Sequence, residues 1–261
     1  MNRIFTIILI ATAIIVSIIL LALIAGIVLE LVTSDSSKVL DTGEVFFAVK
    51  LSLMTATISS IAALCVSIPL AYLLSRYNFF GKIILDTLLD LPIVLSPIAV
   101  GAMLLIFFNT PVGKLINNHL GPFVFDVKGI ILAQFIIVLG LSVRLLKTAF
   151  DGVDPEYENL ARTLGYNRFQ VFCRVVIPIA WRGVLAAFLL VWARAFGEFG
   201  ATLTLAGAMA FKTETIPVAI YLKFESTDIY SMLIFILILI AVSLTTIFAV
   251  RSVKVFRCIG I

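Results

Sequence analysis

Charged and hydroxyl side chains that interrupt long apolar runs are the residues of this chain that could act on a substrate. Arg194 and Glu198 lie four positions apart in one such run, so they can share a helix face. An ionisable residue inside a membrane span is costly and points to a functional site. Arg194 could attract a passing dianion, or the pair could neutralise itself and position helices. We favour the second role, because a tight anion site halfway along a path would slow release.

Small and hydroxyl residues follow this pair. Gly200 permits close approach of a neighbouring helix. Thr202 and Thr204 supply hydroxyl donors near the outer end of the run, where an oxyanion could meet them. These three residues, with Arg194 and Glu198, are therefore candidates for a translocation path.

A second hydroxyl set lies in an earlier apolar run. Ser52, Thr55 and Ser59 have the i, i+3, i+7 spacing of one helix face. Small hydroxyl residues in membrane helices hold helices together more often than they line a pore. We keep both roles for this stripe and favour packing.

Prolines predict an interruption in the third apolar run. Pro92 and Pro97 indicate a kinked or broken helix beside the path, because the freed backbone groups need protein or water around them. Asp86 and Asp90 precede the break, and Lys82 lies four residues before Asp86. The spacing predicts a salt-linked turn of Lys82 with Asp86.

No constellation of catalytic or metal-binding residues is visible in the sequence. The three cysteines are scattered, and His119, the only histidine, lies in a loop rich in turn formers. A GxxxxGK[ST] phosphate-binding motif is absent, so any ATP hydrolysis must come from a separate subunit. We expect no enzyme activity, no metal and no cofactor.

Composition places the chain in the membrane. Hydrophobic residues make up 62% and charged residues 13%, with a mean hydropathy of +1.20, whereas soluble domains carry about 25% charged residues. The sequence predicts an all-α, multi-pass protein of the cell membrane with one membrane domain over residues 1–261. Lys and Arg fall mainly in loops, which favours a role in membrane orientation over binding of nucleic acid.

Six runs are long enough to cross a bilayer, which takes about 20 apolar residues per helix. The first resembles a signal peptide, but it is far longer than an apolar signal core of about 7–15 residues, so we expect a retained helix. The predicted spans are Ile4–Val32, Leu51–Leu74, Leu91–Phe108, Ile130–Phe150, Ile179–Gly207 and Tyr230–Val250.

The distribution of basic residues predicts that both termini face the cytoplasm, because Lys and Arg gather on that side. With this orientation, twelve basic residues lie inside and six outside, and Arg194 lies within a span. The inner residues are Arg3, Arg76, Lys82, Arg144, Lys147, Arg162, Arg168, Arg174, Arg182, Arg251, Lys254 and Arg257, and the outer ones are Lys38, Lys50, Lys114, Lys128, Lys212 and Lys223.

The same orientation places a polar segment, Asp154–Pro178, in the cytoplasm. Asp154 followed by proline is a helix-start signal, and Gly165 predicts the end of that helix. Asn167, with Gln170 three residues later, predicts a reciprocal cap on a second helix that leads to the next span. This 154–178 segment needs water or a partner to solvate it.

The first of these short helices has an apolar face. Tyr157, Leu160, Ala161 and Leu164 fall at i, i+3, i+4 and i+7. One interpretation is an amphipathic helix that lies on lipid. We favour a fit into a protein cleft, because Ala161 is small and the turn that follows is sharp.

The 154–178 segment resembles the "EAA" coupling loop of ABC importer permeases. Ala161, Gly165, Val175, Ile177 and Pro178 match the family pattern at its spacing. The leading glutamate of the family falls at Asn159, whereas Glu158 lies one residue earlier, a rotation of about 100° on a helix. The resemblance implies that Asp154, Glu158, Asn159, Ala161, Gly165 and Pro178 belong to an ATPase-coupling loop.

Further stretches narrow the resemblance. Trp192–Gly207, Lys212–Tyr221 and Leu89–Gly101 are similar to permeases for molybdate, tungstate and sulfate, and GEFGAT followed by TETIPVAIY resembles the molybdate/tungstate branch. This resemblance implies the type I, MetI-like permease fold. It also implies a homodimer, two cytoplasmic ATPase subunits and an extracytoplasmic oxyanion-binding protein.

Two other transport functions stay open at this stage. The first is a sulfate/thiosulfate permease of the same type. The second is a carrier driven by an ion gradient, for which Glu198 is the only deep acid that could couple an ion.

Overall fold

The computed structural model describes residues 3–33 and 42–252, and every regular element in these ranges is a helix. Lys38, Lys254 and Arg257 of the charge count lie outside the described residues. The elements are α1 (Arg3–Thr33), α2 (Thr42–Arg76), α3 (Lys82–Val94), α4 (Pro97–Asn109), α5 (Pro111–Leu120), α6 (Val127–Asp151), α7 (Pro155–Thr163), α8 (Arg168–Val171), the π-helix η1 (Phe172–Val176), α9 (Ile177–Phe196), α10 (Gly200–Ala206), α11 (Ile216–Glu225) and α12 (Ile229–Ser252).

Five continuous helical stretches in the described ranges are long and apolar enough to cross a membrane. A sixth candidate is the bent pair of α3 and α4, whose axes differ by 110°. All six overlap predicted runs, but the fifth is displaced, because its continuous helix begins at Arg168 rather than Ile179. It ends at Phe196 rather than Gly207, because Gly197 closes α9 and a separate short helix, α10, begins at Gly200.

The break in the third candidate span has a local cause. Leu95 and Ser96 adopt extended backbone conformations, and the Ser96 side chain accepts a hydrogen bond from the Ala99 N–H at 3.3 Å. Pro97 then takes the first turn of α4, where its missing N–H costs nothing. The predicted interruption is confirmed, and it lies directly before Pro97, whereas Pro92 stays inside α3.

A stripe of small residues on α2 lets this helix pack closely along α6. The Ser59 hydroxyl lies 3.0 Å from the carbonyl oxygen of Ile131 and 3.0 Å from Gln134 Oε1, both on α6. Small side chains allow two backbones to approach in a membrane, and hydroxyls can bond across the contact. The stripe is fully buried and consists of Ala48, Ser52, Thr55, Ala56, Ser59, Ser60, Ala63, Ser67 and Ala71.

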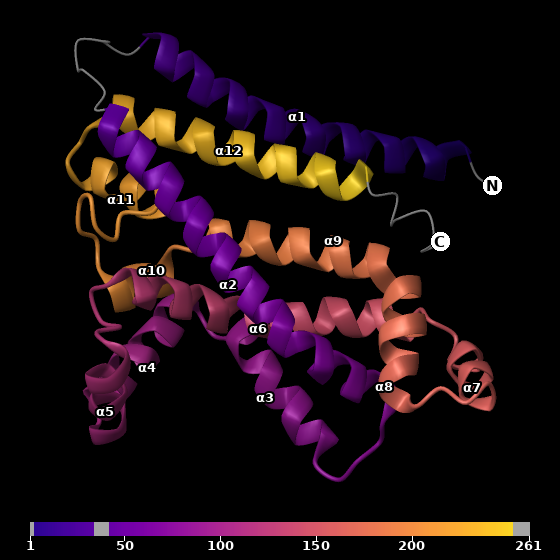
Figure 1. Ribbon diagram of the computed structural model, residues 1–261. Helices are drawn as coiled ribbons and strands as arrows, with labels where there is room; N and C mark the ends of the chain where they lie inside the picture. The colour runs from indigo at the N-terminus through magenta and orange to yellow at the C-terminus, as the bar shows by residue number, and fades with distance from the viewer. Residues whose placement is uncertain (1–2, 34–41, 253–261) are drawn as a thin grey trace.

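The remaining helices surround this contact (Figure 1). Helices α2, α6 and α9 cross the middle of the molecule, and α1 lies beside α12 at one edge. Helix α7 projects from one end of the bundle, where α1 begins and α12 ends, and α10 and α11 lie toward the opposite end. The fold thus presents the predicted polar segment at one end.

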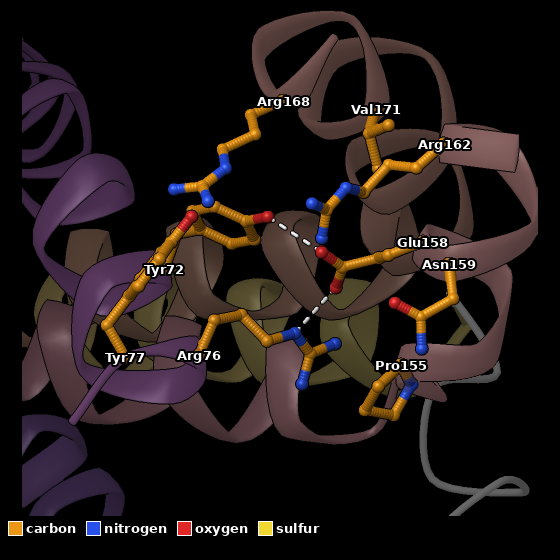
Figure 2. A pocket seen from close by; sticks show the side chains of 9 residues that line it. All are labelled: Tyr72, Arg76, Tyr77, Pro155, Glu158, Asn159, Arg162, Arg168 and Val171. Atoms are coloured by element: carbon orange, nitrogen blue, oxygen red, sulfur yellow. Dashed lines mark hydrogen bonds and ion pairs between the residues drawn. The ribbon is translucent and has the colours of Figure 1, made fainter. Parts of the chain in front are cut away.

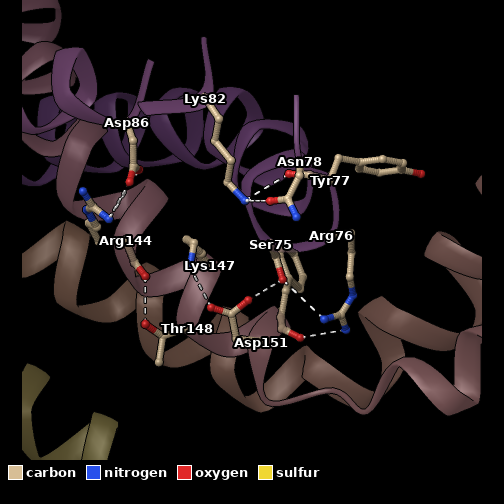
Figure 3. A network of polar contacts seen from close by, with 11 residues as sticks. Ser75, Arg76, Tyr77, Asn78, Lys82, Asp86, Arg144, Lys147, Thr148 and Asp151 are labelled. Carbon is tan, nitrogen blue, oxygen red and sulfur yellow. Dashed lines mark hydrogen bonds and ion pairs between the residues drawn. The ribbon is translucent and has the colours of Figure 1, made fainter. Parts of the chain in front are cut away.

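Ion pairs at the α7 end connect α3 to α6 (Figure 3). Arg144 of α6 pairs with Asp86 at 3.3 Å and also with Asp90. The predicted link between Lys82 and Asp86 is wrong: the Lys82 ammonium donates to the Tyr77 carbonyl at 3.0 Å. Because α3 packs against α6, its acids face across to the arginine of that helix.

A buried polar cluster lies near the opposite end, between α10 and α11. Glu214 is fully buried, and Lys223 donates to Glu44 at 2.7 Å. Burial, together with a hydrogen bond to Glu44, raises the pKa of Glu214 to about 7. The protonated Glu214 carboxyl can donate a hydrogen bond to Glu44, so Glu214 is largely neutral below pH 7.

Gly140 tests how closely α3 lies on α6. A Cβ at this position would collide with the Leu89 carbonyl oxygen of α3. Gly140→Val should therefore lower the free energy of unfolding by about 1–3 kcal/mol through overpacking, measured as a lower Tm in detergent. Gly26→Ala is the control, because nothing lies within 4 Å of its added methyl group. An unchanged Tm for Gly140→Val would contradict this packing.

Glu214 predicts a pH dependence of stability. Its folded pKa of about 7 exceeds the ordinary value of 4.5, so its contribution is complete below pH 4.5 and is lost as the pH rises through 7. Glu214→Gln keeps a neutral side chain and lacks this component. We expect the Tm of the variant, relative to the native chain, to increase between pH 5 and pH 8. Parallel Tm profiles over that range would refute the shifted pKa.

Candidate functional site

The 154–178 segment begins with the predicted capped helix. The Asp154 side chain accepts a hydrogen bond from the Glu156 N–H at 2.9 Å, and Pro155 occupies the first turn of α7. The acids of this turn suit the positive end of the helix dipole. Local sequence therefore determines where α7 starts.

Gly165 ends α7 in a tight turn. Its φ of +89° is a left-handed conformation that glycine adopts without strain. The N–H groups of Gly165 and Tyr166 donate back to the carbonyls of Arg162 and Ala161 at 3.1 and 3.2 Å. This pair of bonds is the Schellman arrangement, which satisfies the last free carbonyls of a helix.

The second short helix leads into the next span. Asn167 and Gln170 form the predicted reciprocal cap, with hydrogen bonds of 2.8 and 2.9 Å. Helix α8 continues without interruption through η1 into α9, and Pro178 lies in the first turn of α9. The helix that follows the Gly165 turn therefore runs unbroken from Arg168 to Phe196.

The apolar residues of α7 do not act as one face. Ala161 is only 6% exposed and joins the buried cluster that contains Phe150. Tyr157, Leu160 and Leu164 are 53%, 61% and 79% exposed. The small alanine thus fits against this chain rather than into a partner, and the large side chains point outward without cover from the described residues.

Glu158 connects α7 to the end of α2 (Figure 2). Its carboxylate accepts from Arg76 Nε at 2.6 Å and from the Tyr72 hydroxyl at 2.7 Å. Arg76 and Glu158 are each only 13% exposed, and Arg76 also donates to the carbonyls of Phe150 and Val153 at 2.9 and 2.5 Å. One arginine therefore holds α2, the end of α6 and α7 together.

Sequence reasoning missed Arg76 and Tyr72 as members of this site. In the sequence, Arg76 was counted only as a basic residue on the inner side. Its position at the end of the apolar run of α2 is a signal that could have identified it, because a residue that anchors a helix end lies there. Asn159, at the position of the family acid, has a different environment from Glu158. It is exposed and lines a pocket between α2 and α7 without bonding to Arg76.

This pocket lies between α2 and α7 and has a volume of about 190 Å³ (Figure 2). Its lining combines three arginines and two tyrosines with the apolar side chains of Pro155 and Val171. The residues are Tyr72, Arg76, Tyr77, Pro155, Glu158, Asn159, Arg162, Arg168 and Val171.

Arg194 and Glu198 form the predicted pair, with 2.6 Å between Arg194 Nη1 and a Glu198 oxygen. Glu198 lies beyond the end of α9 and is 1% exposed, whereas the Arg194 side chain is 40% exposed. The other Glu198 oxygen accepts from the Ala201 N–H at 3.1 Å. Glu198 thus neutralises Arg194 and also caps α10.

The other candidate path residues fall into two separate groups. On α10, Gly200 packs against α4, since an added Cβ would lie 2.9 Å from Ile98 Cγ1. Thr204 donates to the Gly200 carbonyl at 2.7 Å, and Thr202 is fully buried. The second group, Ser52, Thr55 and Ser59, belongs to the buried stripe of α2, where Ser52 accepts from the Ile216 N–H at 2.8 Å.

Some known proteins are similar to this chain in sequence, and others are similar in fold. The molybdenum transport system permease protein ModB of Haemophilus influenzae is 37% identical over 177 residues, which cover 67% of this chain and 77% of the relative. The sulfate transport system permease protein CysT of Escherichia coli is 31% identical over 225 residues, or 83% and 79% of the two chains.

Among solved structures, a bacterial alginate ABC transporter in complex with an alginate pentasaccharide-bound periplasmic protein superposes with a TM-score of 0.74. The match covers 96% of this chain and 95% of that one at 15% identity, so it shows a shared fold. Residues 64–255 match the family of binding-protein-dependent transport system inner membrane components. With this match over most of its length, the chain is a multi-pass membrane protein that belongs to that permease family.

Proposed function

We propose that this chain is the permease subunit of an ATP-driven importer that moves molybdate or tungstate into the cytoplasm. The observation that carries this proposal is its 37% identity to a molybdenum permease over 177 residues, or 67% of this chain. Family members of this kind are not catalytic, so hydrolysis belongs to a separate ATPase subunit.

In this proposal residues 1–261 form one membrane domain of the type I, MetI-like kind, with six spans and both termini in the cytoplasm. The bent α3–α4 pair supplies the sixth span. Two observations support the orientation. With this orientation, twelve basic residues lie on the cytoplasmic side and six on the outer side. In addition, α1 begins and α12 ends at the end of the bundle where α7 projects (Figure 1).

Three kinds of partner complete the transporter. A second copy of this chain forms the path at a homodimer interface, because a single bundle with so few polar groups makes a poor pore. Each copy inserts α7 into one of two cytoplasmic ATPase subunits, which cover the exposed side chains of Leu160 and Leu164. An extracytoplasmic binding protein delivers the anion, and the alginate transporter of similar fold was solved in complex with a periplasmic protein that holds an alginate pentasaccharide.

Movement of the ATPase subunits reaches the spans through two connections. The first is the continuous helix from α8 to α9, which begins beside Gly165. The second is the Glu158–Arg76 ion pair, which ties α7 to α2. Closure of the two ATPase subunits would move α7, and these connections would carry the displacement into α2 and α9 together.

Arg194 has a modest electrostatic role in this proposal. Its guanidinium is part-exposed inside the membrane and retains N–H groups beyond the one bonded to Glu198. A dianion gains some favourable potential there, while buried Glu198 keeps the attraction weak enough for release. Thr202 and Thr204 extend this candidate path along α10, and Ser52, Thr55 and Ser59 contribute mainly by packing α2.

Sulfate is the second candidate cargo, because the sulfate permease match spans 83% of this chain at 31% identity. An ion-gradient carrier has less support. The acid that the sequence offers for coupling an ion, Glu198, is engaged by Arg194 and by the α10 backbone.

Uptake into vesicles tests the cargo. Vesicles that hold this chain, its ATPase and its binding protein should accumulate labelled molybdate only when ATP is supplied. Unlabelled tungstate should compete about as well as molybdate, because the two dianions differ little in size and charge. Sulfate should compete much more weakly. Stronger competition by sulfate would move the assignment to the second candidate, and uptake without the ATPase would contradict the importer.

Gly165 tests the coupling segment. Gly165→Val places a β-branched residue at a φ of +89°, which costs about 1–3 kcal/mol of local strain. It should misplace α7 and abolish most ATP-driven uptake, while the protein still inserts into the membrane. Gly152→Ala is the control, because its φ is −73° and an added Cβ finds only ordinary contacts beyond 3.5 Å. Normal uptake by Gly165→Val would remove the coupling role.

A further inference from the structure

The pocket between α2 and α7 contains more positive than negative charge. Arg76, Arg162 and Arg168 line it, and Glu158 is its one acidic lining residue. Figure 2 shows the guanidinium group of Arg162 near the Glu158 carboxylate and that of Arg168 beside the tyrosine rings on the other side of the pocket. The lining therefore has a net charge of +2 in the absence of an occupant.

Glu158 cannot neutralise the two outer arginines as well. One carboxylate oxygen accepts from Arg76 and the other from the Tyr72 hydroxyl. Within the described residues, the structure records no ion pair for Arg162 or Arg168. Arg168 instead lies over the ring of Tyr77, 5.9 Å from its centroid.

The size of the pocket and its surroundings fit a protein side chain. A water molecule takes up about 30 Å³ of liquid, so a cavity of about 190 Å³ has room for a carboxyl group with its methylenes. Large apolar side chains on the same segment are exposed beside it, with Leu160 at 61%, Leu164 at 79% and Phe169 at 74%. A free anion would leave these side chains uncovered, whereas a protein would bury them.

We propose that this pocket receives a carboxylate side chain, Asp or Glu, of the cytoplasmic ATPase subunit, with Arg162 and Arg168 as its partners. The charged contact then has the basic side on this chain and the acidic side on the ATPase. Glu158 stays with Arg76 and holds the pocket in shape. This inference rests on the proposed function, and it names the chemistry that the ATPase must offer.

The geometry of arginine suits this role. A guanidinium presents several N–H donors in one plane and can bind a carboxylate through two parallel hydrogen bonds. A second arginine on the other side of the pocket, as in Figure 2, can share the same carboxylate. Lysine would keep the positive charge but lose the paired hydrogen bonds. Substitution by lysine therefore separates the contribution of charge from that of the hydrogen bonds.

The affinity of the purified ATPase for this chain in lipid nanodiscs tests the proposal. Arg162→Glu with Arg168→Glu should weaken binding at least about tenfold at low salt, equivalent to about 1.4 kcal/mol. Replacing both arginines by lysine should weaken it less. Arg182→Glu is the control for a single charge reversal, because it makes half of that charge change on α9, outside the pocket, and should leave binding nearly unchanged. Higher salt should weaken native binding by screening the attraction, and it should strengthen binding of the double Glu variant by screening the repulsion between like charges.

Loss of binding in the double Glu variant could also follow from misfolding, so two further measurements are needed. The Tm of the variant should match that of the native chain. Replacement of one acidic residue on the ATPase by Lys should restore binding to the double Glu variant while weakening binding to the native chain. Such a reciprocal exchange identifies the carboxylate directly.

The outcomes separate this inference from the proposed function. If the native chain binds its ATPase and drives ATP-dependent uptake, but charge reversal leaves affinity and salt dependence unchanged, the pocket assignment is wrong and the importer stands. If molybdate binds the pocket in the absence of the ATPase and the arginine variants keep full ATPase affinity, the pocket is a free-anion site and the inference is again overturned. If the native chain neither binds the ATPase nor transports, the proposed function itself fails.

Discussion

The close contact of α2 with α6 is the interaction on which the rest of the structure depends. Apolar burial gives little drive for association inside a bilayer, because lipid tails are as apolar as leucine. Association instead requires tight packing and hydrogen bonds across the contact. The stripe of alanine, serine and threonine on α2 provides both, and Ser59 bonds directly to α6. The two helices then form the platform on which α3, α9 and α10 pack.

The same absence of water explains how the chain tolerates its breaks. A helix interrupted at membrane depth exposes backbone groups that lipid cannot satisfy. At Gly197–Phe199 the Glu198 carboxylate bonds the first turn of α10, and at Leu95–Ser96 the serine hydroxyl bonds the first turn of α4. Each of these two interruptions therefore has a side-chain acceptor that satisfies one of the free N–H groups of the helix that follows.

Local features of this fold could be predicted from the sequence, and distant pairings could not. The caps at Asp154 and Asn167 and the turn at Gly165 depend on neighbours within a few residues, so the sequence shows them directly. The pairing of Arg76 with Glu158 joins residues 82 positions apart. Periodicity contains no information about such a partner.

Two wrong expectations show the same limit. Lys82 and Asp86 have a favourable spacing on one helix, but an arginine on α6 competes for the acid once the helices pack. The fifth span was expected to reach Gly207, because the apolar run continues through α10. Hydropathy does not distinguish one long helix from two that are separated by Gly197 and a capping acid. The roles of the path residues stay predictions.

The inward and outward side chains of helix α7 are under different structural constraints, and this difference affects how the sequence of the protein can change. The inward side chains, Ala161 and Glu158, are fixed by the chain's own packing and by Arg76. The outward side chains are exposed and are not fixed by packing within the chain; they are Leu160, Leu164 and Asn159. Mutations can therefore accumulate on the outward face at little cost to folding, so the surface that α7 offers can change while the membrane bundle stays the same.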